Sequence, residues 1–297
     1  VYKRQEEGEL LLLENLRFHQ GETKNDPQFC EALARLGEVY INDAFGTAHR
    51  AHASTAGVAN LMEDRAVGYL IRKELEFLGA AVLDPQKPFT AILGGAKVSD
   101  KIIVIERLME KVDALIIGGG MANTFLKAQG MEIGDSLLEE DALETAKNLL
   151  DEAKKSGVKI HLPLDVCTAP ELLQEVETKF LKVEDKVQAG WKILDIGPES
   201  VKQFGSVIQN SKTVLWNGPM GVFEYPAFAS GTRGVTEALA KATDAGAVSI
   251  IGGGDSAAAV NQFGMQDRIT HISTGGGASL EFLEGKELPG VSVIPEK

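Results

Sequence analysis

The segment TAILGGAKVSDK, Thr90–Lys101, indicates the fold of this chain, because an apolar run leads directly into two glycines and then two lysines. The same arrangement recurs along the sequence. The runs are apolar throughout, which is typical of strands that helices cover on both faces of a parallel sheet. The six runs are Thr90–Gly95, Ala114–Gly120, Ile193–Gly197, Val214–Gly218, Val248–Gly254 and His271–Gly277.

The segments between these runs carry apolar residues at helical spacing. They are Lys97–Lys111, Glu139–Ser156, Pro198–Asn210, Phe228–Ala245 and Asp255–Phe263. Strand and helix therefore alternate, which predicts a doubly wound α/β domain. Such domains bind ligands at the carboxyl ends of their strands, and the glycines lie at those ends.

The first seventy residues form a different unit, with strand-like runs at Leu10–Glu14 and Val39–Ala44 around a helix-like Asp26–Leu36. Two strands cannot bury a sheet core by themselves, so we expect this Rossmann-like parallel-sheet domain to be incomplete. An amphipathic stretch at Arg72–Val82 predicts a hinge helix that joins the domains. The expected divisions are a partial N-terminal domain at 1–71, an interdomain helix at 72–84, a second domain at 85–278, and a tail at 279–297 that returns toward the first domain.

Composition limits the classes of function. The 297 residues include 30 Lys and Arg against 43 Asp and Glu, a net charge of −13, which argues against nonspecific binding to nucleic acid or an anionic membrane. The two cysteines, Cys30 and Cys167, lie far apart, so a disulfide framework has no support and a cytoplasmic location is expected. The start at Val1 lacks an initiator Met, and we expect an internal or artificial beginning.

Lys97 and Lys101 follow a predicted strand and open a predicted helix, four residues apart and on one face. Cations in a first helical turn cost roughly 0.3–1 kcal/mol each, so the pair suggests that a bound anion compensates them. Two solvated lysines are the alternative. The Walker pattern G-x-x-x-x-G-K-[ST] is absent, which excludes the common nucleotide-binding loop as the origin of this signal.

The segment Gly252–Ala257 matches the dinucleotide fingerprint G-x-G-x-x-A, but the next predicted strand lacks the acidic residue that binds a ribose in NAD enzymes. The first turn of its helix contains Asp255, which is either an N-cap or a ligand of Mg²⁺ at a phosphate site. The segment also lacks the last glycine of the hydrolase motif G-x-S-x-G, which argues against a serine hydrolase.

Arg17 and Arg50 each lie just beyond a predicted strand, and a guanidinium suits carboxylate and phosphate oxygens. His49 and His52 have a metal-ligand spacing but no third ligand nearby, so histidines beside an anion site are the favoured interpretation. A Gly-Pro turn explains Gly218 but leaves the carboxylate of Glu224 without a structural reason.

Seven motifs occur in the order in which the phosphoglycerate kinase family has them, and the chain resembles that family from about Gly8 to its end. They are LENLRF (13–18), NDAFGTAHRAH (42–52), GGAKVSDK (94–101), IIGGGMANTF (116–125), WNGPMGVFE (216–224), IIGGGDSAAAV (250–260) and ISTGGGAS (272–279). Family members begin with roughly a hundred further residues that nothing here matches. The resemblance therefore implies an N-terminally truncated member.

The resemblance implies site residues by motif. Arg17 and Arg50 would bind 3-phosphoglycerate, Lys97 and Lys101 would be catalytic at the transferring phosphoryl group, and Asp255 would hold Mg²⁺. The implied nucleotide-binding residues are Lys101, Gly119, Gly120, Asn217, Glu224, Gly253, Gly254, Asp255, Ser256, Gly275 and Gly276. Ile193 stands where the family often has glycine, so the chain departs from the family at the expected adenine pocket.

The implied reaction is reversible transfer of the acyl phosphate of 1,3-bisphosphoglycerate to Mg-ADP, which gives ATP and 3-phosphoglycerate in glycolysis. It implies closure about the hinge helix, small-molecule substrates, no nucleic-acid or membrane partner, and a monomeric full-length relative. If the N-terminal segment is absent, we expect slow transfer. The alternatives are a nucleotide-binding fragment without catalysis and an NAD-dependent dehydrogenase.

Overall fold

The computed structural model describes residues 8–295, apart from the side chains of 81–83, and the chain divides into two compact units. Unit 1 contains the residues up to Arg72 together with those from Glu287, and unit 2 is Lys73–Lys286. Residues 1–7 of the expected first domain and 296–297 of the expected tail lie outside the described residues. The tail was expected to begin at residue 279, whereas residues 279–286 belong to unit 2.

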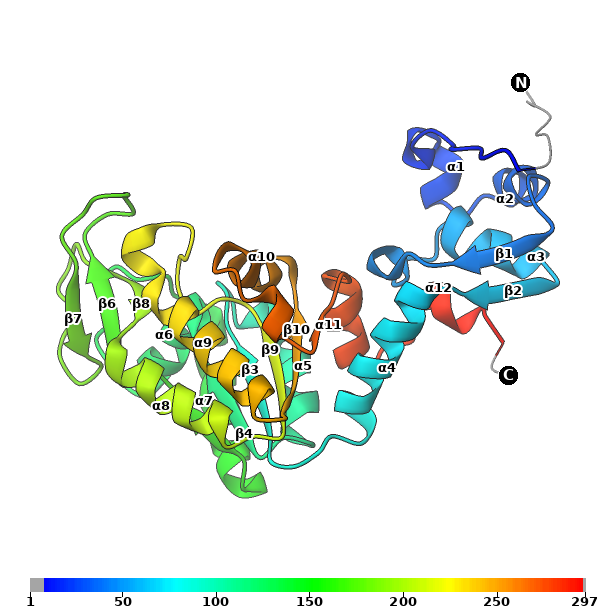
Figure 1. Ribbon diagram of the computed structural model, residues 1–297. Helices are drawn as coiled ribbons and strands as arrows, with labels where there is room; N and C mark the ends of the chain where they lie inside the picture. Colours follow the sequence, from blue (N-terminus) through cyan, green and yellow to red (C-terminus); the bar gives the residue numbers. More distant parts are fainter. Residues whose placement is uncertain (1–7, 296–297) are drawn as a thin grey trace. The chain divides into compact units, whose positions relative to one another are not determined.

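Unit 2 is built on a six-stranded parallel sheet (Figure 1). Five of the six glycine-ended runs form strands of this sheet, which confirms the prediction for them. The strands are β3 (Phe89–Leu93), β4 (Ala114–Ile117), β5 (Lys159–His161), β9 (Thr213–Asn217), β10 (Val248–Gly252) and β11 (His271–Ile272). Every residue of β3, β4 and β9 is buried, in agreement with their uninterrupted apolar sequences.

The order of the strands, β11-β10-β9-β3-β4-β5, reverses direction between β3 and β9. From β3 the chain steps outward to β4 and β5, and from β9 it steps the opposite way to β10 and β11. Leu93 at the end of β3 lies opposite Asn217 at the end of β9. The carboxyl ends of these two strands therefore form a topological switch point, where doubly wound sheets bind ligands.

Helices cover both faces of this sheet, as right-handed crossovers in opposite directions require. The α-helices of unit 2 after the first strand are α5 (Ile102–Met109), α6 (Gly119–Ala128), α7 (Leu143–Ser156), α8 (Pro198–Gln209), α9 (Ser230–Asp244), α10 (Gly254–Gln262) and α11 (Gly277–Leu283). Its 3₁₀ helices are η4 (Ser99–Lys101), η5 (Glu140–Ala142), η6 (Pro226–Phe228) and η7 (Gln266–Arg268). α8 and α9 lie side by side (Figure 1). Fully buried Phe204 and Leu239 from these helices pack in one core with Trp216 of β9.

The run Ile193–Gly197 was predicted to join the parallel sheet, and this is wrong. It forms β8 (Lys192–Ile196), which pairs antiparallel with β6 (Asp165–Ala169) in a separate sheet whose other strand is β7 (Lys179–Lys182). An apolar run indicates that a strand is covered, but it does not specify which strand lies beside it. The prediction therefore identified a strand and misplaced its partner.

Unit 1 contains the parallel pair β1 (Val39–Asn42) and β2 (Asp64–Val67), and the second of these was not predicted. The strand predicted at Leu10–Glu14 is wrong: this segment is not a strand, and Leu10 and Leu12 are 100% and 95% exposed. An apolar run becomes a strand only where another strand pairs with its backbone. Short helices complete the unit: η1 (Leu16–Phe18), α1 (Gln20–Thr23), α2 (Pro27–Ala34), η2 (Phe45–Thr47), η3 (Ala53–Gly57), α3 (Val58–Leu61) and α12 (Pro289–Ser292).

The helix predicted at Arg72–Val82 is confirmed as α4 (Tyr69–Leu83), which crosses the boundary between the units. It begins earlier than predicted because Asp43 Oδ1 accepts hydrogen bonds from the backbone N–H groups of Leu70 and Ile71, at 2.7 and 3.1 Å. Such a bond satisfies N–H groups that a helix start leaves unpaired. Within residues 8–295, every helix is too short or too polar to cross a bilayer.

Candidate functional site

Lys101 is at the switch point of the sheet. Its ammonium donates to the carbonyl oxygen of Gly94, which follows β3, and to that of Asn217 at the end of β9, at 3.2 Å. The residue is only 9% exposed. Burial lowers the pKa of Lys101 to about 8, although the charges of Asp100 and Asp255 oppose this shift. The fold thus places one desolvated cation at the carboxyl ends of two central strands.

Lys97 and Lys101 do not share a helix face, contrary to the prediction. Lys97 is exposed in the loop after β3, whereas Lys101 ends the short helix η4 (Ser99–Lys101) and precedes α5. A change from loop to short helix to α-helix between the two lysines breaks the spacing on which the prediction rested. Because Lys97 and Lys101 do not share a helical turn, no bound anion is needed to compensate two cations in one turn.

Asn217 has a buried hydrogen-bond donor without a protein partner. The residue is 3% exposed, and its Nδ2 makes no hydrogen bond with any described residue. A Cβ built on Gly252 or Gly253 would lie 3.2 or 3.3 Å from this atom, so the amide faces the glycine turn after β10. A buried donor without a partner costs about 1–3 kcal/mol, which a hydrogen bond to a ligand removes.

The turn after β9 requires glycine at residue 218. Gly218 has φ +97°, and an added Cβ would lie 2.2 Å from the carbonyl oxygen of Gly94 and 2.7 Å from Lys101 Nζ. Its N–H donates to the hydroxyl of Ser256 at 2.6 Å. Ser256 is fully buried, so its hydroxyl fastens this turn rather than facing an open cavity. The glycine allows the turn, the strand end and the lysine to approach closely.

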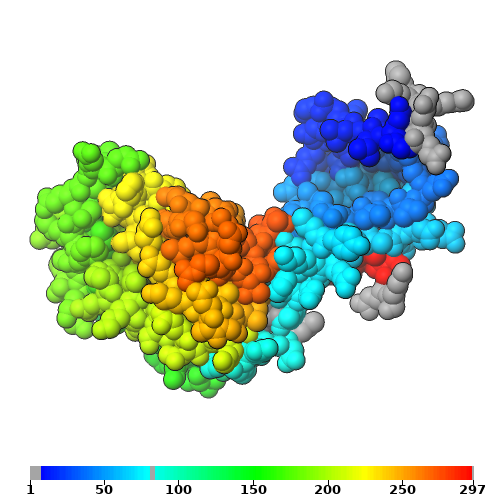
Figure 2. Space-filling view, in the orientation of Figure 1, coloured from blue at the N-terminus to red at the C-terminus, as the bar shows by residue number. Residues whose placement is uncertain are grey.

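Asp255 is not the N-cap of α10, so that alternative from the sequence is wrong. The N-cap is Gly253, with φ +89°, and Asp255 lies two residues further along the helix. Its side chain is exposed, and Figure 2 shows the orange segment that contains α10 at the surface of unit 2. Within residues 8–295, no group of three or more His, Cys, Asp or Glu residues is arranged to hold a metal. His49 and His52 therefore belong to no such group. A metal at Asp255 therefore needs other ligands, such as phosphate oxygens.

A cavity of about 360 Å³ adjoins these turns and brings several predicted residues together. Gly119 and Gly120, at the start of α6, line it together with Glu224 and Asp255. Its other walls are mainly apolar, and none of these residues was predicted to be a site residue. They include Ala122, Leu126, Leu137, Val166, Met220 and Val222. Ile193, the departure from the family pattern, also lines this cavity.

Asp195 is a second buried ionisable group in this wall of unit 2. Burial raises its pKa to about 7, although the N–H groups of Gly231 and Ile196 donate to its carboxylate at 2.7 and 2.9 Å. A Cβ on Gly221 would lie 2.2 Å from Asp195 Oδ1. The carboxylate of Asp195, on β8, therefore lies in contact with the start of α9 and with the loop after β9. No sequence motif predicted Asp195 as a site residue.

Gly275 and Gly276 follow β11 and are not among the residues that line the cavity. Their loop is held by Glu74 of α4, whose carboxylate accepts from Thr274 N at 2.7 Å and lies 2.8 Å from His271 Nε2. Burial raises the pKa of Glu74, but the hydrogen bonds from His271 and Thr274 outweigh burial and leave the pKa below its ordinary value. The structure thus fixes this loop to α4 within unit 2.

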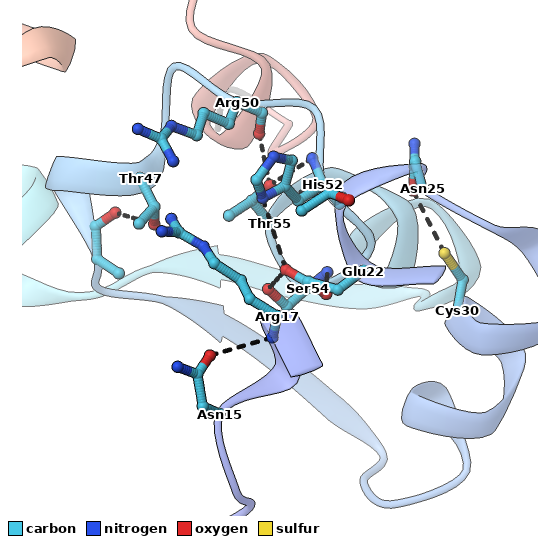
Figure 3. Close-up of polar contacts among 12 residues, drawn as sticks. Asn15, Arg17, Glu22, Asn25, Cys30, Thr47, Arg50, His52, Ser54 and Thr55 are labelled. Atoms are coloured by element: carbon cyan, nitrogen blue, oxygen red, sulfur yellow. Dashed lines mark hydrogen bonds and ion pairs between the residues drawn. The ribbon is translucent and has the colours of Figure 1, made fainter. Parts of the chain in front are cut away.

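Arg17 and Arg50 lie in unit 1, and both are exposed. Figure 3 shows the two side chains extending toward the same side of the close-up. Asn15 Oδ1 accepts from the backbone N–H of Arg17 at 3.1 Å, and Arg50 Nε donates to His49 Nε2 at 3.2 Å. His52 lies 3.8 Å from Glu22 Oε1. Unit 1 therefore has two exposed guanidinium groups, with His49 beside that of Arg50.

Comparison with known proteins identifies the family. A sequence model described as phosphoglycerate kinase matches residues 1–286. The phosphoglycerate kinase of Chloroherpeton thalassium is 58% identical over 287 residues, which cover 97% of this chain and 72% of the relative. That of Clostridioides difficile is 56% identical over 295 residues, which cover 99% of this chain and 73% of the relative.

Solved structures agree with this result. The phosphoglycerate kinase of Coxiella burnetii matches with a TM-score of 0.88 and 44% identity over 94% of this chain and 71% of that one. The enzyme from Pyrococcus horikoshii matches with a TM-score of 0.81 and 34% identity. These shares do not establish the expected absence of an N-terminal segment, and the comparisons do not bear out the expected slow transfer. The chain belongs to the phosphoglycerate kinase family.

Proposed function

We propose that the carboxyl edge of the sheet in unit 2 binds the phosphates of ADP or ATP in this chain's reaction. The chain is an enzyme of its family and transfers the acyl phosphate of 1,3-bisphosphoglycerate reversibly to ADP, with Mg²⁺, in glycolysis. The residue assignments below are our proposal. The observation that carries them is the unpartnered Nδ2 of Asn217, a buried donor beside the glycine turn after β10.

Lys101 and Asn217 approach the same place from adjacent strands. Lys101 Nζ is bonded to the carbonyl oxygens of Gly94 and Asn217, and it is available to donate to a phosphoryl oxygen as well because an ammonium has three donors. Lys97, exposed in the loop before η4, supplies a second cation. Gly253 and Gly254, at the start of α10, have no side chain that would keep a phosphate away from the backbone. Fixed donors of this kind stabilise the charge that develops on a transferring phosphoryl group, so no covalent nucleophile is needed.

Asp255 fits a magnesium site that the nucleotide completes. Its carboxylate is exposed at the start of α10, on the edge of the cavity, and its charge acts on Lys101. Mg²⁺ usually takes one or two carboxylates together with substrate phosphates and water. Asp255 would hold the ion, and the ion would neutralise phosphate charge.

We assign the base and ribose to the cavity of about 360 Å³. Its apolar walls suit a nucleobase, since small-molecule sites are mainly apolar with a few placed polar groups. Glu224 is an exposed carboxylate on the cavity wall and suits the ribose hydroxyls. Gly119 and Gly120 leave room at the start of α6, where a Cβ on Gly119 would lie 2.6 Å from Gly95 N. Ser256 acts on this site through the Gly218 turn.

We assign 3-phosphoglycerate and 1,3-bisphosphoglycerate to Arg17 and Arg50 of unit 1, the phosphoglycerate-binding domain. Exposed guanidinium groups bind carboxylate and phosphate with two parallel hydrogen bonds. Since acceptor and nucleotide are assigned to different units, transfer requires movement about α4, and Gly275 and Gly276 would lie close to the transfer region. A net charge of −13 supports small-molecule substrates over nucleic acid or membrane partners, and two free cysteines support a cytoplasmic location. We also propose that full-length relatives are monomers.

The substitution Asn217→Ala tests this proposal, because it removes the unpartnered donor. We expect the affinity for Mg-ADP, measured by calorimetry, to fall about tenfold, while the free energy of unfolding does not fall, because the substitution removes a buried donor that costs about 1–3 kcal/mol. Asn210→Ala is the control, since Asn210 is an exposed amide bonded to Ser206 O at 2.8 Å. Unchanged Mg-ADP affinity in Asn217→Ala, with ATP formation intact, would reject the assignment of the phosphates to this edge.

A further inference from the structure

Glu139 is joined to residues 94–101, the segment between β3 and α5 that contains both lysines and that we call the lysine loop, although it lies 40 residues beyond Ser99 in the chain. One carboxylate oxygen accepts from the backbone N–H groups of Val98 and Ser99, the latter at 3.2 Å. The other accepts from the hydroxyl of Ser99 at 2.5 Å. Three donors of one short segment therefore end on a single carboxylate, and that segment lies between Lys97 and Lys101.

The segment that carries Glu139 is itself held to α6, the helix that begins at the cavity. Glu139 N donates to Thr124 Oγ1 at 3.3 Å, and Asn123 Nδ2 donates to the carbonyl oxygen of Leu137 at 3.2 Å. Leu137 lines the cavity. Residues 137–139, which we call the strap, thus connect a wall of the cavity to the lysine loop through hydrogen bonds on both sides.

The electrostatics of Glu139 agree with a fixed, ionised carboxylate. Burial raises its pKa, but the hydrogen bonds from Ser99 and Val98 and the charge of Lys97 outweigh burial, so the pKa lies below its ordinary value. Hydrogen bonds to an ionised acceptor are about twice as strong as those between neutral groups. The negative charge also attracts the exposed Lys97.

We propose that Glu139 is a positioning residue, which fixes the lysine loop from the strap and so sets where Lys97 and Lys101 meet the phosphates. This inference rests on the proposed function of those lysines. Glu139 acts through Val98 and Ser99 and does not contact the nucleotide. Catalysis by positioned charge is sensitive to small displacements, and a misplacement of about 1 Å can cost about a hundredfold in rate.

The substitution Glu139→Gln tests the inference, since it keeps the size of the side chain and replaces one acceptor oxygen by a donor. We expect the affinity for Mg-ADP to fall about tenfold and kcat to fall about tenfold to a hundredfold, with the affinity for adenosine unchanged within about twofold. Adenosine is the informative ligand, because it fills the cavity without using the lysines. Glu140→Gln, an exposed neighbour with the same change of charge, is the matched control and should leave all three quantities unchanged.

The variant Ser99→Ala tests the same contact from the other side, because it removes one of the donors to Glu139. We expect a smaller loss in the same direction, and in the double variant the losses should not add. Amide hydrogen exchange of residues 94–101 provides a readout that does not depend on any ligand. Exchange at Val98 and Ser99 should be faster in Glu139→Gln than in Glu140→Gln.

The outcomes separate this inference from the proposed function. If the unsubstituted chain fails to bind Mg-ADP, the proposed function fails, and the exchange measurement alone decides whether Glu139 holds the loop. Unchanged exchange in Glu139→Gln overturns the inference. An equal fall in affinity for adenosine and Mg-ADP also overturns it, because Glu139 would then support the whole site rather than the lysine loop.

Discussion

The cations of unit 2 and unit 1 differ in how the fold holds them. Lys101 is 9% exposed, bonded to the ends of two central strands, with its pKa lowered to about 8. Arg17 lies in the short helix η1, Arg50 lies in the loop after η2, and both are exposed. Burying a cation costs free energy, so the position of Lys101 depends on contacts with several strands of the sheet. The position of an exposed arginine depends mainly on the local backbone that carries it.

This difference predicts two kinds of response to substitution. Changes at the switch point should alter activity together with stability or its pH dependence, because the same contacts serve both. Changes at the arginines should alter acceptor binding alone, because surface substitutions rarely shift stability by more than about 0.5 kcal/mol. Experiments on both units can test whether substitutions in them have these different effects.

Lys101→Met should have the largest effect. Methionine has a side chain of similar length but lacks the ammonium donor. We expect the rate of ATP formation from 1,3-bisphosphoglycerate to fall by about 10²–10³, the usual loss for one stabilising donor. Lys147→Met, on an exposed position of α7, is the control. A rate within about fivefold of the unsubstituted chain would show that the buried lysine serves only the strand ends.

The pH dependence of the chain should follow the lowered pKa of Lys101. Above about pH 8 the folded state loses this proton, so the rate should fall. The unfolded lysine keeps its proton until about pH 10.4, so the free energy of unfolding should rise between these values by up to about 3 kcal/mol. Urea unfolding from pH 7 to 10 measures this rise, and Lys101→Met should abolish it. An equal rise in that variant would assign the effect to another group.

Gly218→Ala should destabilise unit 2 by about 2–3 kcal/mol, because a Cβ would collide with Gly94 O and Lys101 Nζ and the backbone has positive φ. Gly246→Ala separates these causes. Gly246 has nearly the same φ, +96° against +97°, but nothing within 4 Å of its Cβ, so backbone strain alone should cost about 1 kcal/mol. Equal losses in thermal unfolding would mean that the close approach at the switch point contributes nothing.

Arg17→Lys should have the smallest effect and the most selective one. Lysine keeps the charge but loses the planar pair of donors, so we expect the affinity for 3-phosphoglycerate to fall about tenfold. Affinity for Mg-ADP and the unfolding temperature should stay unchanged. Arg35→Lys is the control, since Arg35 is an exposed residue that lies 3.9 Å from Glu31. A loss of stability in Arg17→Lys would break the contrast between the two units.

Much of the fold followed from local sequence pattern. Uninterrupted apolar runs before glycine predicted five strands of the parallel sheet, and helical spacing predicted the helices between them, since both periodicities are properties of neighbouring residues. The same pattern wrongly predicted that β8 joins the parallel sheet and that Leu10–Glu14 forms a strand. β8 pairs with β6 instead of joining the parallel sheet, and Leu10–Glu14 pairs with no strand in the described part of the chain. Both errors concern strand pairing, which local pattern does not specify.

The residue types at the strand ends, and with them the family, could be read from the amino-acid sequence without a structure. The tertiary structure alone decided how they are used. It buried Lys101 and left Lys97 exposed, although both lie in one motif, because only one of them reaches the ends of β3 and β9. It also brought Glu139 to Ser99 across 40 residues. Burial and long-range hydrogen bonds depend on the packing of distant segments, which no local spacing records.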